Sequence, residues 1–162
     1  MATDTAQPQT PLASDLCWLL SRASHGLTTE FSAALEDVGI SPRAHAVLTT
    51  AMCGEHTQSE IARQVGLDKT TMVVTVDELE AAGLAERRAS QTDRRARVIA
   101  VTEAGKRRVE QADNVLDRVR DDVLSVLAPE ERQVFLNALG RLACERLADP
   151  VACAHPVRRP RG

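Results

Sequence analysis

The chain has 162 residues, which is enough for one domain with a hydrophobic core and short for two domains of ordinary size. Hydrophobic residues make up 43% and charged residues 27%, and no apolar run is long enough to span a bilayer, so a membrane protein is excluded. The net charge is −3, but the charges are unevenly distributed along the chain. Residues 87–108 contain eight basic and two acidic residues, and residues 110–149 contain five basic and nine acidic residues. The charge pattern indicates a cationic surface on an otherwise acidic chain.

The two ends of the chain differ in composition from the rest. Residues 1–11 are polar and lack a basic cluster followed by an apolar stretch, so they do not resemble a secretory signal and we expect a cytoplasmic protein. The tail after Asp149 combines three prolines with three arginines. We expect a flexible N-terminus at 1–11, a single domain at 12–148 and a flexible basic tail at 149–162.

The first two expected elements are helices. Apolar residues recur at steps of three and four over 12–38, which predicts one long amphipathic helix closed by the glycine that follows. Ser41 and Pro42 supply an N-cap and a proline at the first helical position, so a second helix should run through about Met52.

The next two helices are short and close together. Thr57 and Glu60 have the spacing of a capping box, which predicts a third helix that ends at Gly66. Asp68 can cap a fourth helix that stops at Gly83. Two helices joined by so tight a turn are typical of a helix-turn-helix, whose second helix enters the major groove of DNA.

The pattern changes after the fourth helix. Residues 84–88 and 97–101 read as strands joined by a polar loop, and Thr102 and Pro129 then begin two further helices. The expected fold is mainly α with a small β-hairpin wing, a winged helix-turn-helix at about 41–102. The apolar faces of 12–38 and 103–148 are too long for this compact unit to cover, so we expect them to form a helical dimerisation region.

The stretch TQSEIARQVGLDKTTMVVTVDELEAAGLAERRASQTDRRARVIAVTEAGKRRVE, Thr57 to Glu110, resembles the DNA-binding part of the multiple antibiotic resistance regulator (MarR) family. Its most specific signature is DRR, followed by an alternating strand and TEAG. The helix order carries the resemblance over residues 12–148. Membership would imply a homodimer with intertwined first, fifth and sixth helices. It would also imply a repressor that binds a palindromic double-stranded operator and responds to a small-molecule effector or an oxidant.

Five residues at the starts of the third and fourth helices are candidate DNA contacts. Gln58 and Ser59 stand where a helix N-terminus suits a phosphate, although capping and solvation explain them equally well. Lys69, Thr70 and Thr71 resemble the family's DNA-contacting positions.

The fourth helix also departs from the common family pattern, which often has Thr and Arg where this chain has Val73 and Val74. No arginine on this helix can bind a guanine bidentately. If Val73 or Val74 faces the groove, it can offer only apolar contact to a thymine methyl, so we expect readout to depend on such contacts and on DNA shape. Of the two, Val74 is the candidate DNA contact.

The loop of the hairpin holds Asp93, Arg94, Arg95 and Arg97, which match the family's wing motif. The resemblance implies that the aspartate braces an arginine at the tip and that an arginine enters the minor groove, where the negative potential is strong.

Trp18, His25, Phe31 and His45 are candidates for an effector pocket, because the family's ligands lodge between the dimerisation helices and the DNA-binding unit. Each of the four is also explained as a packing residue.

Cys17 lies in LCWLL, which resembles the segment carrying the peroxidatic cysteine of organic hydroperoxide resistance regulators. Those regulators hold the thiolate with tyrosines, and this chain has none. Cys17 lies on or beside an apolar stripe, so we expect a buried, inert thiol. Peroxide sensing through Cys17 is the alternative.

An enzyme has little support, because no phosphate-binding loop or nucleophile motif is present and the four histidines are dispersed. We expect no cofactor. Cys53 and His56 form a C-x-x-H pair without a second pair to complete a zinc site, so no metal is expected. A helical protein-interaction module that does not bind DNA remains open, although such modules usually lose the basic wing.

Overall fold

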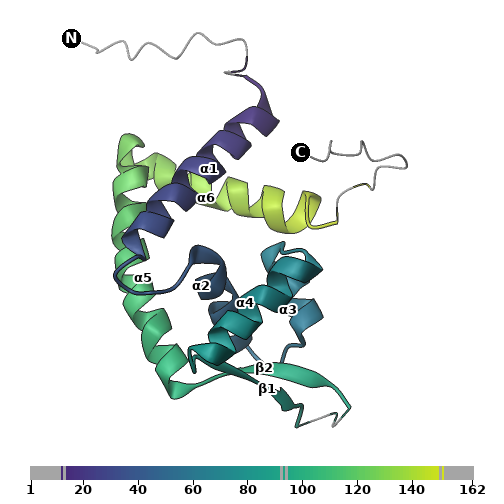
Figure 1. The fold of residues 1–162 in the computed structure, drawn as a ribbon. Coiled ribbons are helices and arrows are strands. Elements are labelled where there is room, and N and C mark those ends of the chain that lie inside the picture. Colours follow the sequence, from purple (N-terminus) through teal and green to yellow (C-terminus); the bar gives the residue numbers. More distant parts are fainter. Residues whose placement is uncertain (1–11, 13, 92, 94, 150, 152–162) are drawn as a thin grey trace, which may run out of the picture. The chain divides into compact units, whose positions relative to one another are not determined.

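The structure is a computed structural model that describes residues 12, 14–91, 93, 95–149 and 151. Residues 1–11 and all of the basic tail except Asp149 and Val151 therefore lie outside it. The chain divides into two compact units, Met1–Arg120 and Asp121–Gly162. The first unit contains the helix-turn-helix and its hairpin (Figure 1).

Helix α1 spans Leu16–Ala34 and is shorter at both ends than the predicted 12–38. Asp15 caps its start, where its carboxylate accepts a hydrogen bond of 2.7 Å from the backbone N–H of Trp18. The helix ends early because the chain turns to bury Leu35, and Gly39 closes the turn with a φ of +74°. That left-handed conformation favours glycine.

The next three helices agree with the prediction. They are α2 at Pro42–Met52, α3 at Gln58–Val65 and α4 at Lys69–Ala81. The side chain of Ser41 caps α2, and the Thr57 capping box opens α3. Gly66 ends α3 at a φ of +70°, which lets the chain reverse within two residues and enter α4.

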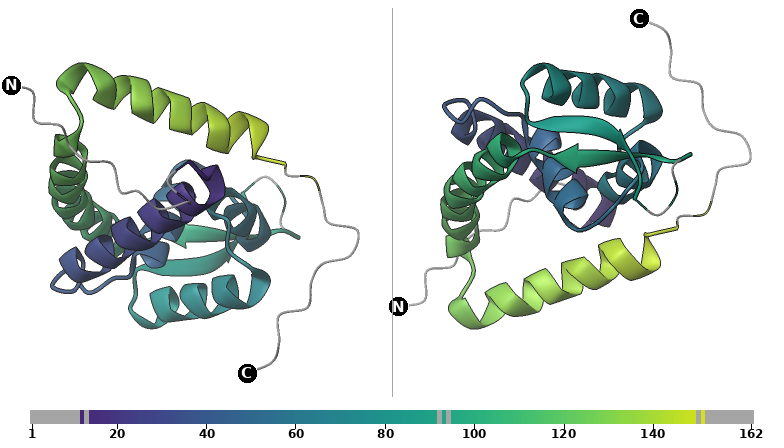
Figure 2. Two further views of the ribbon diagram at one scale, coloured as in Figure 1. Left: turned by 90° about the horizontal axis from the view of Figure 1, so that it is seen from above. Right: turned by 90° about the horizontal axis from the view of Figure 1, so that it is seen from below.

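The hairpin consists of β1 at Ala85–Ala89 and β2 at Arg97–Val101, paired antiparallel with Arg87 opposite Ile99. A bridge between Thr57 and Val98 joins the chain just before α3 to β2. Strand β1 lies against α4 and β2 against α3, so the hairpin is attached to both helices of the helix-turn-helix (Figure 2).

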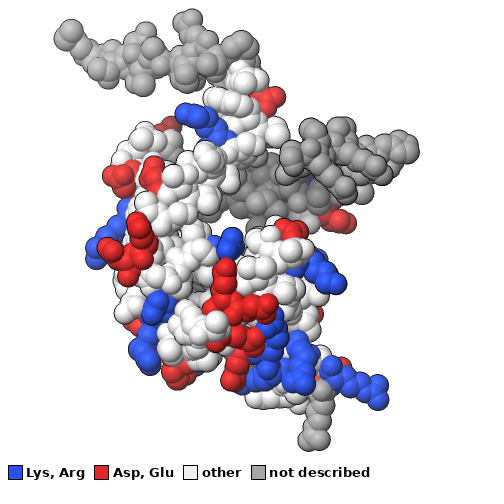
Figure 3. Space-filling view, viewed as in Figure 1, with Lys and Arg blue, Asp and Glu red and all other residues white. Residues whose placement is uncertain are grey.

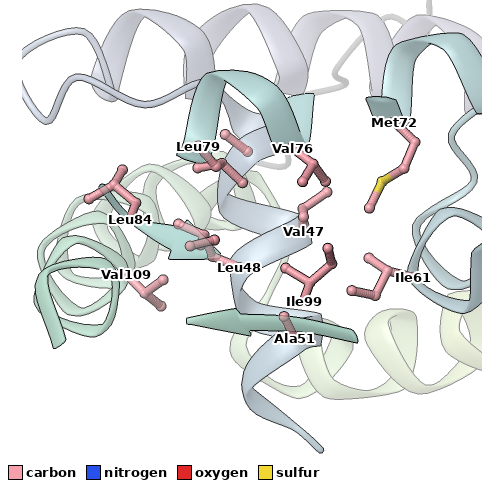
Figure 4. Close-up of a cluster of buried hydrophobic side chains, with 12 residues drawn as sticks. Val47, Leu48, Ala51, Ile61, Met72, Val76, Leu79, Leu84, Ile99 and Val109 are labelled. Atoms are coloured by element: carbon pink, nitrogen blue, oxygen red, sulfur yellow. The ribbon is translucent and has the colours of Figure 1, made fainter. Parts of the chain in front are cut away.

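One apolar core holds these elements together (Figure 4). Every helix from α2 to α5 and both strands contribute a buried side chain to it. Burial of a large aliphatic side chain is worth roughly 1.5–3 kcal/mol, so the core is the main source of stability for this unit. Its largest fully buried apolar members are Leu48, Ile61, Met72, Val47 and Val76.

Helix α5 spans Glu103–Val123 and begins against the hairpin. The hydroxyl of Thr102 donates to the carbonyl of Gly83 and accepts the backbone N–H of Gly105. Further along, Arg108 donates to the carbonyl of Val38 at 2.6 Å. A second apolar cluster, Leu35 with Ala112 and Leu116, packs the turn after α1 against α5.

The second unit contains the last residues of α5, a short 3-10 turn at Leu124–Val126, helix α6 at Pro129–Arg141 and one π-helical turn at Leu142–Arg146. The carboxylate of Glu131 accepts the backbone N–H of Ala128 at 2.9 Å and so caps α6. No residue of α6 is buried. None of the helices in the described part of the chain is both long and apolar enough to cross a membrane.

Candidate nucleic-acid interface

The start of α4 presents a polar end to solvent. Asp68 accepts the backbone N–H groups of Thr70 and Thr71 at 2.9 and 3.0 Å and the hydroxyl of Thr71 at 2.6 Å. The hydroxyl and then the N–H of Thr71 lower the pKa of Asp68 below its ordinary value. The hydroxyl of Thr71 is therefore engaged in the cap, while the exposed side chains of Lys69 and Thr70 remain available to a ligand.

The start of α3 is also capped by its own residues. Glu60 accepts the backbone N–H of Thr57 at 2.7 Å and its hydroxyl at 2.8 Å, and these two hydrogen bonds lower the pKa of Glu60. The side-chain carbonyl of Gln58 accepts two N–H groups of Arg87, at 3.2 and 3.3 Å. Ser59 is exposed. Of the two candidates here, Ser59 is the more accessible.

A groove of about 370 Å³ lies between α3 and α4. Within the described residues, Arg63 and Lys69 form no hydrogen bond or ion pair, and no acidic residue lines the groove. Two unpaired cations beside an apolar floor suit a DNA phosphate. Sequence reasoning missed Arg63, because helical spacing alone does not show which face of α3 borders the groove. The lining residues are Gln58, Ser59, Ala62, Arg63, Leu67, Lys69 and Met72.

The tip of the hairpin is braced by Asp93. Its carboxylate accepts the backbone N–H of Arg95 at 2.9 Å, and its own N–H donates to the hydroxyl of Ser90 at 3.2 Å. The bracing of Arg95 thus acts on its backbone and leaves its guanidinium exposed. The side chains of Arg95 and Arg97 have no partner among the described residues, and Arg94 lies outside them.

The start of the hairpin loop is fastened to the loop before α3 by Glu55, which sequence reasoning did not single out. Its carboxylate accepts the hydroxyl of Ser90 at 2.6 Å and the backbone N–H of Gln91 at 3.1 Å. Arg88 lies 3.9 Å from the same carboxylate. These contacts set the position of the hairpin relative to α3.

Arg87 joins the hairpin to the helix-turn-helix. From β1 its guanidinium donates to Gln58 on α3 and pairs with Asp77, at 2.7 Å, and with Glu80, both on α4. The backbone N–H of Arg87 also donates to Glu80 at 2.7 Å. Although Arg87 belongs to the basic segment, its charge is neutralised, so it holds the interface in shape and is not a free cation for DNA.

Acidic residues on α4 are paired in the same way. Arg43 on α2 lies 3.4 Å from Glu78, and Asp77 is held by Arg87. Figure 3 shows basic side chains gathered around the hairpin, with a band of acidic side chains beside them. Four cations without a partner among the described residues therefore belong to this interface: Arg63 and Lys69 at the α3–α4 groove, and Arg95 and Arg97 on the hairpin.

The candidate effector residues lie apart from this interface. Trp18, His25 and Phe31 are on α1, and Phe31 packs against the cluster of Leu35. On α2, Nε2 of His45 lies 2.7 Å from the carboxylate of Asp113 on α5. The pocket that these residues were expected to line remains a prediction.

Cys17 is exposed in the single chain, so the expected burial of its thiol is wrong for one copy of the protein. The apolar stripe of α1 runs beside it, but α1 as a whole buries no residue within its own chain.

An exposed helix of a helix-turn-helix beside a cationic hairpin defines the class of winged helix-turn-helix DNA-binding proteins. A sequence profile of the MarR family matches residues 38–96. A MarR-family transcriptional regulator from Rhodococcus sp. RHA1 is 29% identical, with a TM-score of 0.76 over 83% of this chain and 96% of that one. The chain is therefore similar to MarR-family transcriptional regulators, both in the sequence of its DNA-binding unit and in its fold.

Two further structures are of one relative, CouR. CouR from Rhodococcus jostii RHA1, bound to p-coumaroyl-CoA, is 28% identical, with a TM-score of 0.75 over 90% of this chain and 99% of that one. CouR bound to a 23-mer DNA duplex is described as a transcriptional repressor. It is 27% identical, with a TM-score of 0.74 over 82% of this chain and 94% of that one.

Proposed function

We propose that this protein is a sequence-specific transcriptional repressor that binds a palindromic operator as a homodimer. The observation that carries the proposal is a set of four cations, on α3, at the start of α4 and on the hairpin, that have no partner among the described residues. Arg63 and Lys69 flank the α3–α4 groove, and Arg95 and Arg97 lie on the hairpin. This arrangement suits an α4 that enters the major groove while the hairpin follows the backbone or the minor groove.

Apolar side chains left uncovered on two helices support the homodimer. Leu16 and Leu19 on α1, and Val134 and Phe135 on α6, are each exposed in the single chain. Large apolar side chains exposed on two helices favour an interface, and a second copy of the chain would bury them. A symmetric dimer has two α4 helices, each of which can bind one half-site of the DNA. We therefore expect a palindromic operator.

A small-molecule effector would release the operator. CouR was solved both with DNA and with p-coumaroyl-CoA, and a relative that binds both supports ligand control here. We retain Trp18, His25, Phe31 and His45 as candidate contacts. The contact between His45 and Asp113 joins α2 to α5, so a ligand that displaced it would act on a helix of the DNA-binding core. A regulator of this kind works at the chromosome, and we place it in the cytoplasm.

The test is selection of bound duplexes from a random DNA library, followed by affinity measurements on the enriched sequence at several salt concentrations. We expect an inverted repeat whose half-sites are about one helical turn apart, and an affinity that falls steeply with salt. Failure to enrich any sequence would overturn the proposal and favour a protein-interaction module.

A further inference from the structure

The solvent face of α4 is divided into two halves. Its exposed residues recur at the helical period, and the buried ones, such as Met72 and Val76, face the core. The first half of the exposed face carries Lys69, Thr70, Val73 and Val74. The second half carries acidic residues.

The acidic half is poorly suited to contact bases. Asp77 pairs with Arg87 and Glu78 with Arg43, so both carboxylates already have cationic partners. A carboxylate can accept a hydrogen bond from cytosine, but doing so here would require breaking an ion pair. Direct contact with bases is therefore left to the first half of the face.

Packing within the chain accounts for only part of the surface of Val73 and Val74. Their side chains are 37% and 46% exposed, so methyl groups of both remain accessible to a ligand. Valine is also a weaker helix former than alanine, because its branched Cβ loses rotamer freedom. Helix propensity alone therefore does not favour two adjacent valines here, and their accessible methyl groups are available to a partner outside the chain.

The surroundings of the two valines indicate a polyanion as the occupant. Lys69 lies one turn earlier on the same face, and Arg63 is on the other side of the α3–α4 groove; both are unpaired among the described residues. A purely apolar protein partner would leave these charges unmatched, whereas duplex DNA supplies phosphates for them. In the major groove the apolar group available to a valine is the 5-methyl of thymine.

We propose that Val73 and Val74 form an apolar contact with thymine methyl groups and so select thymine in each operator half-site. The proposal rests on the proposed function, because it requires α4 to enter the major groove. Burial of one methyl group contributes about 0.8 kcal/mol, which corresponds to about a fourfold change in affinity. A palindrome that presents one such thymine per half-site should therefore show about a fifteenfold effect.

The experiment starts from the duplex enriched by selection. Each thymine of a half-site is replaced in turn by deoxyuridine, which removes the methyl and keeps every hydrogen-bonding group. We expect one or two positions at which paired replacement in both half-sites weakens binding about fifteenfold. The double variant Val73→Ala/Val74→Ala should bind the natural operator with a similar loss and should no longer distinguish thymine from deoxyuridine there.

Lys69→Ala is the matched control, because it also alters the exposed face of α4. It should weaken binding to the thymine and deoxyuridine duplexes by the same factor. Both variants are at exposed positions, and their folding is checked by circular dichroism.

The outcomes separate the two proposals. An enriched operator that binds equally well after every deoxyuridine replacement would overturn the role of the valines while leaving the proposed function intact. Full sensitivity to deoxyuridine in Val73→Ala/Val74→Ala would also overturn it, since the methyl would then be read elsewhere. Absence of any enriched sequence would count against the proposed function itself.

Discussion

At the scale of single residues, two arginines of the hairpin have different surroundings. Arg87 is 30% exposed and pairs with Asp77 and Glu80, whereas the side chain of Arg95 has no partner among the described residues. Arg95→Ala should weaken operator binding by about 1–3 kcal/mol and leave stability nearly unchanged. Fluorescence anisotropy and urea unfolding measure the two quantities.

Arg87→Ala is the informative comparison, because it leaves partly buried Glu80 without its cation and should lower both stability and affinity. Wild-type affinity in Arg95→Ala at moderate salt would show that the hairpin does not contact DNA through this residue.

Cys17 allows a second prediction at this scale. The thiol of Cys17 is exposed in the single chain, so burial does not make it unreactive. Within the described residues, however, its Sγ has no hydrogen-bond partner. A reactive thiolate needs a stabilising donor or cation. Stoichiometric organic peroxide should therefore leave operator binding unchanged, as measured by gel shift, and Cys17→Ser should behave like wild type. Release of DNA by peroxide, abolished in Cys17→Ser alone, would instead establish oxidant sensing.

At the scale of elements, the junction between the hairpin and α5 depends on Gly105. A Cβ at this position would overlap the carbonyl oxygen of Leu84 and approach Cγ1 of Val101 to 2.7 Å. Gly105→Ala should destabilise the protein by about 1–3 kcal/mol, as in other overpacked sites, which chemical unfolding would reveal. Gly26→Ala on α1 is the matched control, because nothing lies within 4 Å and the change should be neutral or stabilising. Equal stability of the two variants would rule out the close packing at Gly105.

The capping box of α3 predicts a dependence on pH. Hydrogen bonds from Thr57 lower the pKa of Glu60 below 4.5, so the folded state prefers the carboxylate. The contribution of Glu60 to the stability of the fold is present above the pKa of this residue in the unfolded chain. It is lost as the pH falls through the lower pKa of Glu60 in the folded protein. Glu60→Gln retains a capping side chain without the titration. Thermal unfolding followed by circular dichroism between pH 7 and about pH 3 should show a smaller loss of Tm in Glu60→Gln than in wild type.

The elements themselves were largely predictable. Caps and stops such as Ser41, Thr57 and Asp68 are local signals, and the helices they open begin where predicted. The end of α1 was missed because burial of Leu35 is a tertiary effect that periodicity cannot show. The paired state of Arg87 was missed for the same reason, since its partners lie up to 29 residues away in sequence. Counting charges identified the cationic segment but not which charges remain unpaired.

At the scale of the whole molecule, the uncovered apolar side chains make self-association the main expectation. Phe135 on α6 is 46% exposed, and Phe135→Glu should convert a dimer into a monomer, because a buried unpaired charge at an interface is costly. Operator affinity should fall with it, since one protein would then hold a single half-site. Sedimentation at micromolar concentration measures the oligomeric state. Met52→Glu, at 47% exposure near the end of α2, is the matched control and should remain dimeric. A wild-type protein that sediments as a folded monomer would contradict the expectation.

Helix α4 has a buried face and an exposed face, and this division has a consequence for evolution. Val73 and Val74 face solvent, while the positions that hold the helix in place, among them Met72 and Val76, face the core. Substitutions at Val73 and Val74 therefore affect folding less than substitutions at Met72 and Val76. After a gene duplication, such a helix lets one copy acquire a new set of target genes by a few changes at these positions while both copies keep the same fold.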